Sequence, residues 1–86
     1  MVELDVRVLP PPKKHSTIYE TLARLGPGET LRITNDHDPR PLRFELEHDY
    51  PECFTWNYLE AGPETWRVDI VKTNVARVEG DRSEES

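Results

Sequence analysis

The fold is decided by residues 16–34, which read STIYETLARLGPGETLRIT. The first half of this segment has apolar residues at helical spacing: Ile18, Leu22 and Leu25. With Thr17 in a capping-box position, this spacing predicts a helix at about residues 16–25. The Gly26-Pro27-Gly28 run should end that helix, and the alternation in residues 29–34 predicts a strand.

On the N-terminal side, apolar and polar residues alternate, with the apolar set being Val2, Leu4, Val6 and Val8. This period of two predicts a first strand with one buried face. Pro10-Pro11-Pro12 should end it in a stiff, extended turn, because proline cannot donate to a ladder or enter a helix interior.

On the C-terminal side, Asp38 and Pro39 are typical of an N-cap and a first helical residue, so a second helix should run from there to about His48. Two alternating aromatic and apolar runs follow, at residues 54–59 and 66–71. The four residues Ala61-Gly62-Pro63-Glu64 between them predict a hairpin.

The predicted element order is therefore βαβαββ, which favours an α+β two-layer sandwich. Two right-handed crossovers place both helices on one face of a four-stranded mixed sheet. The first three strands should point the same way and the fourth should run antiparallel. We expect a single domain at residues 1–72 and a polar, disordered tail at residues 73–86.

Composition narrows the classes of function. The 86 residues carry a net charge of −6, and Lys13-Lys14 alone is a poor basic face, so we expect no nucleic-acid partner. No secretory signal and no run of about 20 apolar residues is visible, so we expect a cytoplasmic protein without a membrane partner. Cys53 is the only cysteine, which excludes an internal disulfide and a multi-thiolate metal site.

Strand direction also predicts where a site would lie. The loops at residues 10–15, 35–38 and 61–64 should meet at the carboxyl end of the parallel strands, where open α/β sheets bind ligands and helix N-termini present unpaired N–H groups. His15 and His37 would then share one side of the molecule. His48 and Cys53 would lie at the opposite end.

Several runs of residues resemble one known family. They are Leu9-Pro10-Pro11-Pro12 with His15, the run from Asn35 to Leu42, Tyr58-Leu59-Glu60, and Gly62-Pro63-Glu64 with Trp66-Arg67-Val68. Over residues 3–72 the chain resembles the family called domain of unknown function 2249, of the TusA/SirA-like fold. The resemblance implies a TusA-like sandwich and an accessory domain, found alone or joined to hemerythrin-like or cupin-like metal-binding proteins. Pro11 occupies the position of the sulfur-carrier cysteine, so the persulfide role is not carried over, and we do not expect an enzyme.

The leading hypothesis is a non-catalytic binding or regulatory domain. The residues expected to bind its ligand are His15, Asn35, Asp36, His37, Asp38, Arg40 and Arg7. Lys13-Lys14, at a helix start, would favour a small anion such as a phosphate, sulfur oxyanion or carboxylate. The structural alternative is that Asp38 caps the second helix, Asn35 and Asp36 form a local turn, and the histidines bond to nearby backbone.

Two further possibilities stay open. In one, His15 and His37 bind a transition metal, with Asp36 or Asp38, as an accessory protein in redox or sulfur metabolism. In the other, Arg40, Arg7 and the aromatic hairpin dock a protein partner. The alternative for the hairpin is that Trp56 and Trp66 are core residues. Catalysis is disfavoured because no Ser, Thr or Cys is presented as a nucleophile at this rim.

Overall fold

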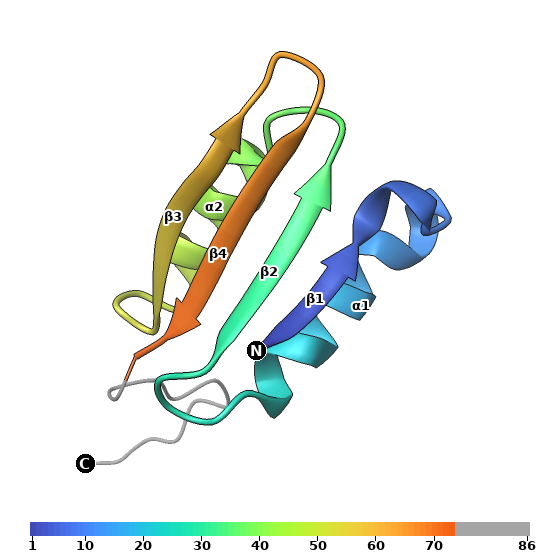
Figure 1. Cartoon of the computed structure of the whole chain (residues 1–86). Coiled ribbons are helices and arrows are strands. Elements are labelled where there is room, and N and C mark those ends of the chain that lie inside the picture. The colour runs from blue at the N-terminus through green and yellow to red at the C-terminus, as the bar shows by residue number, and fades with distance from the viewer. Residues whose placement is uncertain (74–86) are drawn as a thin grey trace, which may run out of the picture.

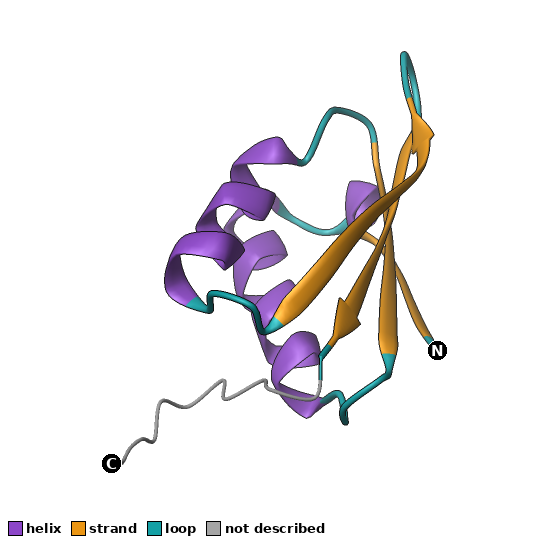
Figure 2. Cartoon of the chain, turned by 90° about the vertical axis from the view of Figure 1, so that its left-hand side faces the viewer, coloured by secondary structure: helices purple, strands orange, loops and turns teal. Residues whose placement is uncertain are grey.

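The computed structural model describes residues 1–73 as two layers, a four-stranded sheet and two helices (Figure 1). In chain order the elements are β1 (Val2–Asp5), the 3-10 helix η1 (Val6–Val8), α1 (Pro11–Arg24), β2 (Thr30–Asn35), α2 (Arg40–Asp49), β3 (Phe54–Ala61) and β4 (Trp66–Lys72). Both helices lie on the same face of the sheet (Figure 2). The predicted α+β sandwich is confirmed.

The strand order is β1-β2-β4-β3, so the last strand is inserted between β2 and its own hairpin partner. β1 and β2 are parallel, and β4 is antiparallel to both β2 and β3. The first three strands therefore share one direction, as predicted. In Figure 1, α1 lies behind β1 and α2 lies behind β3 and β4, so the region over the end of β2 lies between the two helices.

The core lies between the sheet and the helices. Its buried members are Val6, Ile18, Leu22, Leu25, Leu31, Ile33, Leu46, Val68 and Ile70. The opposite face of the sheet is polar, and there Arg32 makes a bidentate pair with Asp69 across the β2–β4 register, at 2.7 and 3.0 Å. This one-sided burial explains the period of two in β2.

The three prolines do not form an extended turn, so that prediction is wrong. Pro10 is the N-cap of α1, and Pro11 and Pro12 occupy its first turn, five residues before the predicted start. The first turn of a helix needs no N–H donors and the proline φ already suits it, so prolines are tolerated there. Thr17 is consequently an interior residue, whose carbonyl accepts the Thr21 hydroxyl, and not a cap.

Two other boundaries differ from the predictions. The first strand ends at Asp5, because the Asp5 carboxylate accepts the backbone N–H of Arg7 and turns the chain into η1. At the start of α2 the N-cap residue is Pro39, which offers no side-chain bond. Asp38 does not cap the helix, since its carboxylate instead accepts the hydroxyl of Tyr58 at 2.7 Å.

The last strand, β4, supplies hydrogen bonds to the C-terminal end of α1. Lys72 is buried, and its ammonium donates to the carbonyls of Leu22 at 3.3 Å and Leu25 at 2.7 Å. These carbonyls belong to the end of α1, where backbone acceptors have no helical partner and a positive charge is favourable. β4 and α1 are therefore joined by polar bonds as well as by the core.

The predicted tail at residues 73–86 lies outside the described residues, except for its first member. Thr73 belongs to the domain, since its N–H donates to the Cys53 carbonyl at 2.9 Å and its hydroxyl to the Glu52 carbonyl at 2.7 Å. Neither helix in the described part of the chain has the length and apolarity to cross a membrane.

Candidate functional site

A cavity of about 250 Å³ opens between α1, α2 and the end of β2, and we call it the histidine cavity. Its polar lining residues are Lys14, His15, Asn35, His37 and Glu45. Its apolar lining residues are Val6, Ile18, Ile33, Pro39, Pro41 and Leu42. Because Val6, Ile18 and Ile33 are core residues, they form an apolar floor beneath a polar rim.

One side of the rim is a bridge between the two helices. His15 of α1 and Glu45 of α2 are joined by a hydrogen bond of 2.5 Å between Nε2 and Oε1, and both side chains are about half exposed. The His15 ring also packs on Tyr19, with ring centroids 4.7 Å apart. Burial, followed by the negative charge of Glu45, raises the pKa of the Tyr19 hydroxyl, which keeps this phenol neutral. Glu45 thus orients the imidazole at the cavity mouth.

The other side of the rim is the loop after β2. His37 Nδ1 lies 2.7 Å from Asp36 Oδ1, and this hydrogen bond lowers the pKa of Asp36, with a smaller contribution from the charge of Lys14. Asn35 is buried, and its amide oxygen accepts the N–H of Asp36 at 2.9 Å. The NH₂ group of Asn35 is therefore the donor that this side chain can offer to a ligand.

The start of α1 does not present the expected backbone donors. Pro11 and Pro12 have no N–H, and the N–H of Lys13 already donates to the Pro10 carbonyl at 2.8 Å. The prediction of unpaired N–H groups at this helix end is therefore wrong. Any attraction for an anion at this side of the cavity has to come from side-chain charge, and Lys14 lines the cavity.

Asp38 and Arg40 line a second depression, of about 400 Å³, on the other side of the α2 start. We call it the arginine groove. Its residues are Asp38, Arg40, Arg43, Phe44, Tyr58, Ala61 and Trp66. It lies between α2 and the β3–β4 hairpin, so it is separate from the histidine cavity.

The seven residues predicted for one site therefore divide into three groups. His15, Asn35 and His37 line the histidine cavity, and Asp36 is bonded to its rim through His37. Asp38 and Arg40 line the arginine groove. Arg7 lines neither, because its guanidinium makes a bidentate pair with Asp5, both bonds being 2.8 Å.

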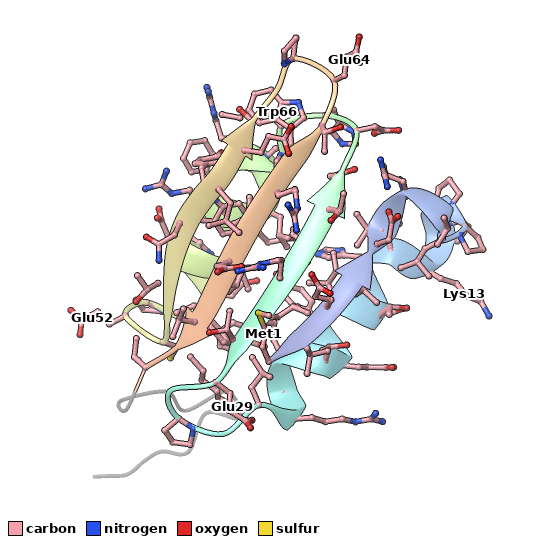
Figure 3. All side chains as sticks on the ribbon, viewed as in Figure 1. Met1, Lys13, Glu29, Glu52, Glu64 and Trp66 are labelled. Carbon is pink, nitrogen blue, oxygen red and sulfur yellow. The ribbon has the colours of Figure 1, made fainter. Side chains whose placement is uncertain are left out.

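Cys53, His48 and the two tryptophans do not line the histidine cavity. Cys53 is buried next to Glu52, at the opposite end of the sheet from Trp66 (Figure 3). His48, in the last turn of α2, bonds to the neighbouring Asp49 and lines neither depression. Trp56 packs against the core, whereas Trp66 lines the arginine groove, so the core alternative holds for one tryptophan only.

Two residues that line the histidine cavity, Lys14 and Glu45, are not among the predicted site residues. Glu45 lies three residues after Leu42 and one before Leu46, on the inward side of α2, and a carboxylate there is an available signal. The sequence predicts Lys14 only as one of two lysines at a helix start, whereas in the structure it lines the cavity. Because α1 starts at Pro11, both Lys14 and Ile18 lie within the helix, and their spacing of four residues places them on one face.

The histidines do not form an evident metal centre. Within residues 1–73, no group of three or more His, Cys, Asp or Glu side chains has an arrangement that could hold a metal ion. Each of the two cavity histidines is instead bonded to one carboxylate, Glu45 or Asp36.

The comparisons with known proteins give one result. A family model described as an uncharacterized conserved protein (DUF2249) matches residues 3–72, a span that includes every residue of the histidine cavity and of the arginine groove. Comparison with curated proteins and with solved structures gives no match.

Proposed function

The chain belongs to the DUF2249 family, and we propose that it is a non-catalytic binding domain whose histidine cavity takes a small organic carboxylate. The observation that carries the proposal is the combination of an apolar floor with a rim of one ammonium and two imidazoles in a single cavity. Neither α1 nor α2 could supply this combination alone.

The apolar floor suits the hydrocarbon part of such a ligand, and the polar rim suits its carboxylate. Burial of the ligand's hydrocarbon part against the floor contributes about 25 cal/mol of favourable binding free energy per Å² of apolar surface. Lys14 and the NH₂ group of Asn35 offer N–H donors to a carboxylate, and bonds to a charged acceptor are stronger than neutral ones. The two imidazoles, each bonded to a carboxylate, form the sides of the rim. Glu45 is bonded through Oε1 to His15 and holds that ring at the rim.

The volume of the histidine cavity limits the size of the ligand. A cavity of about 250 Å³ is smaller than the roughly 300–1,000 Å³ of sites for drug-sized molecules. The ligand is therefore the size of a short aliphatic or single-ring acid. We propose binding and not catalysis, because no Ser, Thr or Cys is among the described residues that line the cavity.

Sodium benzoate titrated into isotope-labelled protein, followed by NMR, tests the proposal. We expect the signals of His15, His37 and the Asn35 amide to shift and saturate, with the His48 signal unchanged as the internal control. Benzamide, which has the same ring and no charge, should bind more weakly. Lys14→Gln should weaken benzoate but not benzamide, whereas His48→Ala should change neither. Equal shifts with the two ligands, or shifts that avoid the cavity, would contradict the proposal.

A transition-metal site at His15 and His37, in an accessory protein of redox or sulfur metabolism, is the second candidate. One observation favours it: each imidazole is bonded to a carboxylate, as metal-binding histidines commonly are. Calorimetry with zinc and nickel tests it. Heat that is present in the wild type and in His48→Ala but absent in His37→Ala supports a metal. Identical heat in all three proteins counts against it.

A relation to the TusA-like sulfur carriers is proposed for the fold alone. The first turn of α1, where such a carrier needs a thiolate, begins with Pro11 and Pro12. Neither residue can hold a persulfide, so the proposed ligand is one that binds without forming a covalent bond.

A further inference from the structure

The arginine groove combines exposed aromatic surface with positive charge. Phe44 of α2 is 59% exposed and Tyr58 of β3 is 36% exposed, although both are large side chains with apolar rings, and both line the groove. Trp66 lies beside Tyr58, with the two ring centroids 6.2 Å apart. We call Phe44, Tyr58 and Trp66 the aromatic wall of the groove. A cluster of exposed aromatic side chains commonly marks an interaction site, because aromatic residues are enriched at protein interfaces.

The aromatic wall is held in place before any partner binds. The Tyr58 hydroxyl donates to Asp38 at 2.7 Å, and its ring makes edge contacts with both tryptophans, at centroid distances of 6.0 and 6.2 Å. A Cβ on Gly62 would lie only 2.6 Å from the Trp66 ring, so the turn packs directly on the indole. A fixed wall loses little entropy on binding, which favours affinity.

The charge of the groove is opposite to that of the chain. Its lining contains two guanidinium groups and one carboxylate, and the two oxygens of that carboxylate, on Asp38, already bond to Tyr58 and Arg40. Arg40 is 64% exposed and pairs with Asp38 at 3.3 Å, while Arg43 pairs with the exposed Glu47 at 3.1 Å. Such exposed pairs are weak, so both guanidiniums can exchange partners at little cost.

From these observations we propose that the arginine groove docks an acidic segment of a partner protein that places an aromatic or aliphatic side chain against Phe44, Tyr58 and Trp66. Acidic groups on either side of that anchor would replace Asp38 and Glu47 as partners of the two arginines. A second copy of this chain fits less well, because two molecules of net charge −6 repel each other. The site differs from the histidine cavity in both its residues and its position, with Trp66 at the hairpin end and Lys13 beside the start of α1 (Figure 3).

Two synthetic peptides with blocked ends test the proposal on the full chain. One has the sequence DELFED, and the other, NQLFQN, replaces every acid with its amide. We expect the acidic peptide to bind at least about ten-fold more tightly in 0.1 M salt, with NMR shifts at Phe44, Tyr58 and Trp66. Arg40→Gln and Arg43→Gln should each weaken it by up to about five-fold, the range of single exposed ion pairs. Arg24→Gln, an exposed arginine at the end of α1, is the control and should leave the affinity unchanged.

The peptide experiment has results that overturn the proposal and one that supports it. Equal affinity for the two peptides removes the role of the arginines, and shifts confined to the histidine cavity remove the role of the groove. Either result overturns the proposal. So does sedimentation showing a dimer in which Arg43→Glu prevents association, because a second copy would then be the occupant. The proposal is supported by saturable binding of the acidic peptide that is weakened in the arginine variants and unchanged by benzoate.

Discussion

The turn that supports the groove allows a quantitative test of the packing. Gly62 has a φ of +79°, and a Cβ at this position would lie 2.6 Å from Cζ2 of Trp66. Gly28 has a similar φ of +86°, but no heavy atom lies within 4 Å of its virtual Cβ. Alanine at either position incurs the same left-handed strain, about 1–2 kcal/mol. The reduced freedom of the unfolded chain offsets about 0.4–1 kcal/mol of that strain.

Only Gly62→Ala adds a steric conflict, since the indole has to move away from the new methyl group. Overpacking of this kind costs about 1–3 kcal/mol. We therefore expect the free energy of unfolding to fall by about 1–3 kcal/mol more in Gly62→Ala than in Gly28→Ala. For a domain of this size, each kcal/mol corresponds to about 4–8 °C in Tm.

Urea unfolding of the two variants, followed by circular dichroism, measures this difference. In a Trp66→Ala background the two glycine substitutions should become equally costly, because the ring that causes the conflict is gone. If Gly62→Ala and Gly28→Ala have the same free energy of unfolding in the wild-type background, the close contact between the turn and Trp66 does not exist, and the fixed aromatic wall loses its support.

Three further predictions concern polar contacts. Lys72→Met should lower the free energy of unfolding by about 1.5–3 kcal/mol, because the bonds from its ammonium to the carbonyls of Leu22 and Leu25 are lost; urea unfolding measures this, and an unchanged midpoint would contradict it. Tyr58→Phe should cost about 0.5–1.5 kcal/mol through loss of the bond to Asp38, and a double-mutant cycle with Asp38→Ala should show coupling between the two; additive effects would argue against the bond. His37→Ala should raise the pKa of Asp36 toward 3.8, as followed by carboxyl NMR, because the hydrogen bond that lowers it is removed. The sign follows from linkage: a depressed pKa in the folded state gives stability that is present above pH 3.8 and is lost as the pH falls through the folded value, so the variant should lose less stability in acid than the wild type.

The fold could be predicted because its elements have clear periodicities. Alternation at β2 and β4 and the apolar stripe of α1 each gave one interpretation, and the handedness of crossovers then set the strand directions. The failures lie at element ends, where one residue type suits two roles. Prolines end a strand and also begin a helix, so residues 10–12 were assigned to the wrong element.

The grouping of residues at the candidate site could be predicted in part for the same reason. Strand direction brought His15, Asn35 and His37 together, although they come from separate elements. The division between two depressions could not be predicted, because His37 and Asp38 are neighbours in the chain. What separates them is the bond from Asp38 to Tyr58, which is 20 residues away in sequence, and no local pattern signals such a partner.

The buried lysine at the end of β4 has a consequence for synthesis. Leu22 and Leu25 leave the ribosome long before the residue whose ammonium binds their carbonyls, which is 50 and 47 positions later in the chain. Until Lys72 emerges, the carbonyls of Leu22 and Leu25 lack the ammonium that binds them, and β2 lacks the central strand beside it. The nascent domain therefore cannot mature in stages from its N-terminus, and its final packing is reached only when nearly all of the matched region has been translated.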